Sequence, residues 1–126
     1  YAHHPTEIKS ILKSLKATSY SRKLISVFQP HRYSRLKALK KDFAFSFTNS
    51  DLVILCPVYA AGEKRDKKYN PINFANLISK YSKVQVLLIK DEKDLKKFFD
   101  KNLIKDEIVV CMGAGSISKW IREMKL

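Results

Sequence analysis

Short hydrophobic runs alternate along the chain with segments in which hydrophobic residues recur every three or four positions. The runs are LISVF at 24–28, LVILC at 52–56, VQVLLI at 84–89 and EIVVCM at 107–112. Uninterrupted hydrophobic runs of this length are typical of strands that are covered on both faces. They therefore predict four buried strands, of the kind found in parallel sheets.

The intervening segments predict helices, because their hydrophobic residues fall on one face at helical spacing. Pro5 and Pro71 each suit the first position of a helix. Strict alternation of strands and helices predicts an α/β fold: a three-layer, Rossmann-like domain with a mostly parallel sheet flanked by helices. The first helix has no strand before it, so we expect one upstream of Tyr1. The expected helix faces are Ile8, Ile11, Leu12 and Leu15; Leu36, Leu39, Phe43 and Phe47; Phe74, Leu77, Ile78 and Tyr81; Leu95, Phe98 and Phe99; and Ile117, Trp120, Ile121 and Met124.

The positive charge of the chain is compatible either with a protein that binds nucleic acid or a membrane surface, or with a protein whose lysines are simply solvated. With 126 residues the chain has the length of one domain, and its net charge is +13. Such an excess is typical of proteins that bind nucleic acid or a membrane surface. Most of the lysines, however, are spread over the predicted helices, which favours solvated helix faces; only residues 63–69 form a dense basic loop. A basic nucleic-acid-binding module remains the alternative.

Cysteine use and hydropathy indicate the compartment. Cys56 and Cys111 both fall inside predicted strands, which favours two buried hydrophobic side chains in a reducing environment over a disulfide. No hydrophobic run approaches the length of a membrane span, and the first ten residues contain no hydrophobic signal region. We therefore expect a cytoplasmic protein.

The unusual residues are concentrated where the predicted strands end. In parallel α/β sheets, ligands bind at the carboxyl ends of the strands. Four segments should lie there: 1–6, 29–35, 57–63 and 113–116. Arg32 and Arg35 open a helix, where the helix dipole disfavours cations, and they are spaced to share one face. This favours binding of an anion, a carboxylate or a phosphate, over two solvated arginines.

Two further patterns are less specific. His3, His4 and His31 have no cysteine or carboxylate at a recognisable ligand spacing, so a zinc site is not expected. GAGS, at 113–116, fits an anion cradle at a helix start and equally a tight turn with Ser116 as the helix N-cap. The chain also lacks a P-loop. The residues alone thus indicate an α/β domain with a basic, anion-binding edge.

Four motifs, in order and spacing, carry a resemblance that covers essentially the whole chain: YAHHPTEI, FQPHRYSR, VYAAGE and GAGSIS. They resemble the C-terminal domain of the Mur ligase family, in the branch that joins L-alanine to UDP-N-acetylmuramate. The resemblance implies that residues 1–126 are one such domain, excised from a three-domain ligase of peptidoglycan precursor synthesis. ATP and Mg²⁺ would bind in the full enzyme, with the P-loop and magnesium site on the central domain. This domain would bind no cofactor alone, would dock on the central and N-terminal domains, and would be inactive by itself.

The resemblance also implies roles for individual residues. The sequence departs from the family pattern in two places: an acidic residue expected just before Tyr1 is absent, and Ala2 stands where glycine is common. The resemblance nevertheless has the following implications. It implies no catalytic residue or metal ligand in this chain, no membrane contact and no specific nucleic acid. The implied substrate-binding residues are His4, His31, Arg32, Arg35 and Ser116; the nucleotide-binding residues are Tyr1 and His3; and Tyr59 and Glu63 would wall the pocket.

Overall fold

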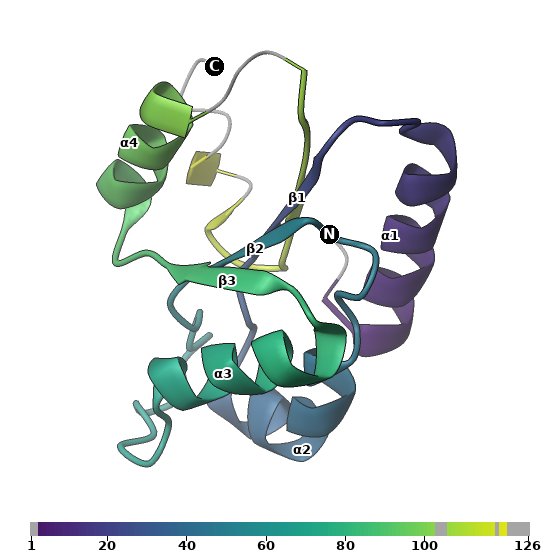
Figure 1. The fold of residues 1–126 in the computed structure, drawn as a ribbon. Helices are drawn as coiled ribbons and strands as arrows, with labels where there is room; N and C mark the ends of the chain where they lie inside the picture. Colours follow the sequence, from purple (N-terminus) through teal and green to yellow (C-terminus); the bar gives the residue numbers. More distant parts are fainter. Residues whose placement is uncertain (1–2, 103–105, 118, 121–126) are drawn as a thin grey trace.

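The computed structural model describes residues 3–102, 106–117 and 119–120, and these form a layered α/β domain (Figure 1). The four strands make one sheet in the order β3-β2-β1-β4, and every neighbouring pair is parallel. The elements are α1 (Pro5–Thr18), β1 (Leu24–Phe28), α2 (Tyr33–Ala44), β2 (Leu52–Leu55), α3 (Pro71–Ser82), β3 (Gln85–Leu88), α4 (Glu92–Asn102) and β4 (Ile108–Met112).

The strand order fixes where a ligand crevice can form. From β1 the chain moves outward through β2 to β3, and then crosses back to place β4 on the other side of β1. In the register, Ile25 of β1 lies between Leu52 of β2 and Val109 of β4. The strand order therefore reverses between β1 and β4, the position at which α/β sheets bind ligands beyond the strand ends.

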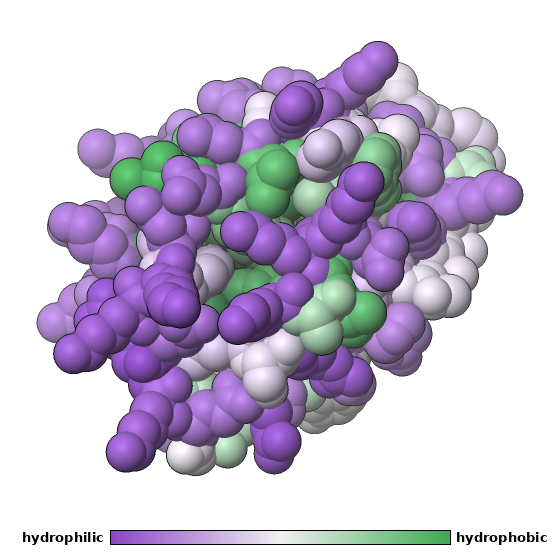
Figure 2. All heavy atoms as spheres, turned by 90° about the horizontal axis from the view of Figure 1, so that it is seen from below, coloured by the Kyte–Doolittle hydropathy of each residue, from purple (hydrophilic) through white to green (hydrophobic). Residues whose placement is uncertain are grey.

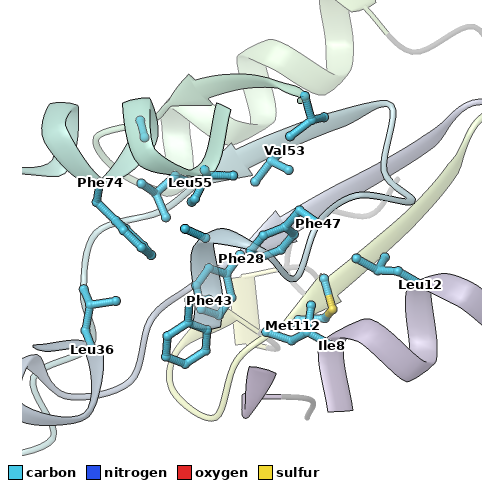
Figure 3. Close-up of a cluster of buried hydrophobic side chains, with 14 of the residues drawn as sticks. Ile8, Leu12, Phe28, Leu36, Phe43, Phe47, Val53, Leu55, Phe74 and Met112 are labelled. Carbon is cyan, nitrogen blue, oxygen red and sulfur yellow. The ribbon is translucent and has the colours of Figure 1, made fainter. Parts of the chain in front are cut away.

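Helices cover both faces of the sheet, which confirms the three-layer prediction. Side chains of α1, α2 and α3 pack on one face around Phe28, whose ring centroid lies 5.3 Å from those of Phe43 and Phe47 (Figure 3). On the other face, Leu95 and Phe99 of α4 pack with strand residues. Both faces of the central strands are thus buried, as their uninterrupted hydrophobic sequences predict. The prediction is wrong for the edge strand β3, in which Gln85 is exposed and Leu88 is 42% exposed.

Two helix-face predictions are wrong. Phe47 is buried but lies in the turn after α2, which ends at Ala44. The hydroxyl of Ser82 donates to the Ala44 carbonyl and accepts from the Phe47 N–H, which satisfies backbone groups that a longer helix would have paired. Ile11 is 37% exposed, whereas Ile8 and Leu12 are fully buried. The stripe of α1 that faces the sheet is therefore narrower than its sequence indicates.

Most of the lysines on helices are solvated, as expected. Lys37 and Lys41 on α2, and Lys96 and Lys97 on α4, are exposed. Figure 2 shows the side on which α2 and α3 lie in Figure 1, and hydrophilic side chains cover most of it. None of the helices among the described residues has the length and apolar character needed to cross a membrane.

Both cysteine thiols are free. Burial raises the pKa of Cys56 to about 12 and that of Cys111 to about 11, so neither is a thiolate at neutral pH. The prediction of a buried hydrophobic side chain is confirmed for Cys56, whereas Cys111 is only partly buried. Of the last predicted helix, Ile117 and Trp120 are described, while Ile121 and Met124 lie outside the described residues.

Candidate functional site

The loops that follow β1 and β2 are joined at the carboxyl edge of the sheet. The N–H of Tyr59 donates to the Pro30 carbonyl at 2.8 Å, and the N–H of Arg32 donates to the Tyr59 carbonyl at 2.8 Å. These two bonds form an isolated parallel bridge between His31 and Tyr59. The bridge extends the pairing of β1 with β2 and fixes the FQPHRYSR loop against the VYAAGE loop.

His31 lies at the centre of this edge. Its ring stacks on the ring of Tyr59, with centroids 5.7 Å apart, and it meets the His3 ring edge-on at 6.2 Å. Its Nδ1 atom is buried and has no hydrogen-bond partner. Burial is the main cause that lowers the pKa of His31, and the nearby positive charges of Arg32 and Arg35 lower it further. The neutral form of His31 is therefore favoured at neutral pH, and its buried Nδ1 has no hydrogen-bond partner within the protein.

Arg32 and Arg35 supply the positive charge of the site. Within the described ranges, no carboxylate lies within ion-pair distance of either guanidinium. Arg32 is exposed and its backbone has φ 68° and ψ 134°, a conformation that a non-glycine residue adopts only under strain. The structure therefore holds an unpaired arginine at a strained position, which is typical of residues that bind a ligand.

Glu63 caps helix α2. The Ser34 N–H donates to Glu63 Oε1 at 3.2 Å, and the Ser34 hydroxyl donates to Oε2 at 2.5 Å. The Ser34 hydroxyl is the main cause that lowers the pKa of Glu63, and backbone N–H groups of Ser34 and Tyr33 also lower it. The anion at this helix start is thus partly supplied by the protein itself. The first-turn N–H group of Ser34 is thus occupied, which leaves the side chains of Arg32 and Arg35 as the candidate groups for an external anion.

Gln29 is a site residue that the sequence analysis missed. It is 3% exposed, and its side-chain amide joins the end of β1 to the turn after β4. Gln29 Nε2 donates to Ser116 Oγ at 2.9 Å, and the Ile117 N–H donates to Gln29 Oε1 at 3.0 Å. Its position in the sequence could have identified it, because Gln29 is a polar residue directly after a buried strand and before Pro30, at the edge of the sheet where a ligand is expected.

The two glycines of GAGS are required by close packing. A Cβ on Gly115 would lie 2.7 Å from Cβ and Cδ1 of Tyr59, and one on Gly113 would lie 2.9 Å from the Gln29 carbonyl oxygen. The N–H of Ile117 is already bonded to Gln29, and the Trp120 N–H donates to the Ser116 carbonyl at 3.1 Å. This geometry favours a tight turn into a helix over an anion cradle.

The remaining predicted site residues divide into two groups. His3 joins His31, Arg32, Arg35, Tyr59 and Glu63 at the carboxyl edge. His4 instead caps α1, where its Nδ1 accepts from the Thr6 N–H at 3.3 Å, and Ser116 bonds to Gln29. Tyr1 lies outside the described residues. Across the described part of the chain, no three His, Cys, Asp or Glu side chains are arranged to hold a metal ion.

Comparison with known proteins identifies the family. The family model described as "Mur ligase, glutamate ligase domain" matches residues 1–115. The UDP-N-acetylmuramate–L-alanine ligase of Pelagibacter ubique is 48% identical over 98% of this chain, and that of Fusobacterium nucleatum is 44% identical over 98%. The chain spans only 27% and 25% of these two relatives, about a quarter of their length.

Solved structures agree on the fold. A UDP-N-acetylmuramate–alanine ligase from Thermotoga maritima matches with a TM-score of 0.73 at 23% identity, over 98% of this chain and 24% of that one. A murein peptide ligase from Psychrobacter arcticus also matches with a TM-score of 0.73, at 17% identity over 98% of this chain and 25% of that one. The alternative of a nucleic-acid-binding module finds no support in these matches. The sequence and family-model matches show that this chain belongs to the Mur ligase family.

Proposed function

We propose that residues 1–126 form the C-terminal domain of an ATP-dependent ligase that joins L-alanine to UDP-N-acetylmuramate in peptidoglycan precursor synthesis. Two UDP-N-acetylmuramate–L-alanine ligases are 48% and 44% identical to this chain over 98% of its length. The observation that carries the proposal is the pair of unpaired arginines, Arg32 and Arg35, beside a neutral His31 at the carboxyl edge. We place the reaction in the cytoplasm.

The proposed reaction forms an amide from a carboxylate and an amine, so the carboxylate must first be activated. ATP transfers its γ-phosphoryl group to the carboxylate of UDP-N-acetylmuramate, which gives an acyl phosphate. The amino group of L-alanine attacks the acyl carbon, an amide bond forms, and phosphate leaves. Both the alanine carboxylate and the phosphoryl group are anions that a guanidinium can bind through two parallel hydrogen bonds.

Each group of site residues is assigned a different part of the substrates. We assign Arg32 and Arg35 to the alanine carboxylate and the transferring phosphoryl group, and the wall formed by His31 and Tyr59 to the alanine side chain. Glu63 positions the first turn of α2, from which Arg35 projects, through its bonds to Ser34. The further substrate contacts that the resemblance implies are His4 and Ser116, and the further nucleotide contacts are Tyr1 and His3.

The described residues fit the phosphates of ATP better than a metal ion. Unpaired guanidinium groups are suited to phosphate, whereas no metal-binding group of side chains is present among them. Mg²⁺ would therefore be held by the central domain of the full protein, on which this domain would dock. Closure of the domain over ATP would bring Arg32 and Arg35 to the reacting groups and exclude water.

The test is an assay of the full-length protein that carries this chain. We expect phosphate release that requires UDP-N-acetylmuramate, ATP, Mg²⁺ and an amino acid together, with a higher kcat/KM for L-alanine than for glycine, L-serine or D-glutamate. Residues 1–126 alone should release no phosphate above a buffer control. A preference for D-glutamate, or for a peptide in place of L-alanine, would refute the proposed substrate while leaving the family assignment intact.

A further inference from the structure

Gln29 is bonded to both ends of the turn that follows β4. Its backbone N–H donates to the carbonyl of Met112, the last residue of β4, at 2.9 Å. Its side-chain amide donates to Ser116 Oγ at 2.9 Å and accepts from the Ile117 N–H at 3.0 Å. The side chain is only 3% exposed, so these bonds are made in a protected environment. Gln29 therefore fixes where the turn at 113–116 lies relative to the end of β1.

The side chain of Tyr59 reaches across the end of β1 to contact this turn. β1 lies between β2 and β4 in the sheet, so it separates the loop after β2 from the turn after β4. Paired strands are about 4.8 Å apart, which puts β2 and β4 roughly 10 Å apart. A Cβ added to Gly115 would lie 2.7 Å from Cβ and Cδ1 of Tyr59, so the glycine backbone packs directly against that side chain. The turn thus supports Tyr59 from the far side of β1.

Tyr59 in turn holds two residues of the proposed alanine site. Its carbonyl accepts from the Arg32 N–H at 2.8 Å, and its ring stacks on the His31 ring with 5.7 Å between centroids. Arg32 has φ 68°, a strained conformation for a non-glycine residue, and such a conformation persists only where surrounding contacts hold it. The position of Tyr59 therefore affects both the backbone from which the Arg32 side chain projects and the orientation of the His31 ring.

The segment 29–32 is consequently held at both of its ends. Gln29 is bonded to the turn after β4, and Arg32 is bonded to the loop after β2. Pro30 lies between them, with a restricted φ and a carbonyl that accepts from the Tyr59 N–H at 2.8 Å. Removal of the Gln29 amide would release the turn, and with it the support of Tyr59, while every group assigned to the substrate remains in place.

We propose that Gln29 is a positioning residue for the binding of L-alanine. Its amide holds the turn at 113–116 against Tyr59. Tyr59 then keeps Arg32 and His31 in the geometry that binds the amino acid. Gln29 acts through these residues and makes no contact with the substrate itself. The proposal rests on the proposed ligase function, in which Arg32 and His31 contact L-alanine.

The experiment uses the full-length protein and two readouts. The first is the KM for L-alanine at saturating ATP and UDP-N-acetylmuramate, with each variant assayed at the same interval below its own Tm. The second is the NMR shift of the His31 ring protons, in protein with ring-labelled histidine, because the stacked ring of Tyr59 displaces these signals. Displacement of a binding group by about 1 Å can cost roughly 100-fold. We expect Gln29→Leu to raise the KM for L-alanine about tenfold. The His31 shifts should move toward those of Tyr59→Ala.

Two further variants separate positioning from stability. Gln29→Glu keeps an oxygen for the Ile117 N–H and should recover part of the KM, since the Ser116 hydroxyl can donate to its second oxygen. Val84→Ala removes buried methyl groups directly before β3, at the opposite edge of the sheet, where Val84 is 6% exposed. It should lower the Tm but leave the KM for L-alanine and the His31 shifts at wild-type values.

An unchanged KM for L-alanine in Gln29→Leu would overturn the proposal, and so would an equal rise in Val84→Ala. His31 shifts that stay at wild-type values in Gln29→Leu would also overturn it, because Tyr59 would then not depend on the Gln29 amide. If the wild type does not use L-alanine, the proposed function fails, and the His31 shifts alone decide whether Gln29 positions the site.

Discussion

The imidazole of His31 stacks on the phenol ring of Tyr59, with 18° between the ring planes. The two residues come from loops after different strands, and backbone bonds between those loops hold them together. Tyr59 also lies close to Gly115, in the turn after β4. Tyr59 is 40% exposed, so its place depends on these contacts and not on burial in the core. Three loops thus converge on one ring, and this arrangement can be tested residue by residue.

Gly115→Ala should destabilise the protein by displacing Tyr59. The added Cβ would overlap the base of the Tyr59 side chain, where the ring cannot swing away cheaply. We expect a loss of about 1–3 kcal/mol, the usual cost of overpacking, measured by chemical denaturation. In a double-mutant cycle, Tyr59→Ala should recover only part of the loss, because alanine removes the ring but keeps the Cβ that lies 2.7 Å from the added carbon. Gly62→Ala is the matched control: it has open space but φ 89°, so any cost there should not depend on Tyr59.

Gln29→Leu should be destabilising although leucine has a similar size. It removes the acceptor of the buried Ile117 N–H and the donor to Ser116. A buried donor left without a partner costs about 1–3 kcal/mol, and the thermal melting temperature should fall accordingly. An unchanged Tm would show that water or another group replaces the glutamine amide, and that Gln29 does not hold the turn.

Glu63→Gln should lower stability in a pH-dependent way. The pKa of Glu63 is below its ordinary value of 4.5 in the folded protein, so the carboxylate stabilises the fold fully above that pH. As pH falls below 4.5 and through the lowered pKa, this contribution is lost. We expect the variant to melt a few degrees below the wild type at pH 7, and the difference to shrink toward pH 3. A difference that stays constant between pH 7 and pH 3 would exclude the charged cap.

His31 should titrate below 6.5. Burial and the two arginines disfavour its protonated form, so the pKa should rise in Arg32→Ala and, by less, in Arg35→Ala. The measurement is an NMR titration of the histidine ring protons, with His31→Gln to assign the signal. Because the unfolded chain binds a proton at this residue before the folded protein does, His31 also lowers stability as pH falls below 6.5. A pKa above 6.5, or one insensitive to Arg32→Ala, would place His31 outside the arginine field.

The fold was predictable because each strand and helix is marked by a pattern of hydrophobic residues within its own short segment of the sequence. Uninterrupted hydrophobic runs gave the four strands, and the alternation with helices gave the parallel, layered arrangement. Phe47 was misplaced because the end of α2 depends on Ser82, a residue 35 positions away. Gln29 and the Glu63 cap escaped prediction for the same reason: their partners are distant in sequence.

Topology alone decides which loops meet at the carboxyl edge of a parallel sheet, and it predicts that His31, Arg32, Arg35 and Tyr59 lie near one another. It could not assign roles within that edge. His4 has the same residue type as His3 and lies next to it, yet its Nδ1 caps α1. That difference depends on side-chain rotation, which no spacing in the sequence records.

The measurement that tests the central claim most directly is kcat/KM for L-alanine in the full-length Arg35→Ala variant, taken beside a thermal melt. If the guanidinium binds the alanine carboxylate or the transferring phosphoryl group, a charge-assisted bond of about 1.5–3 kcal/mol is lost, and kcat/KM should fall roughly 10- to 200-fold with little change in Tm. Arg35→Lys keeps the charge without the planar fork and should recover only part of the activity. Unchanged kcat/KM in Arg35→Ala, or a loss of activity that follows a fall in Tm, would contradict the assignment of Arg35 to the substrate site.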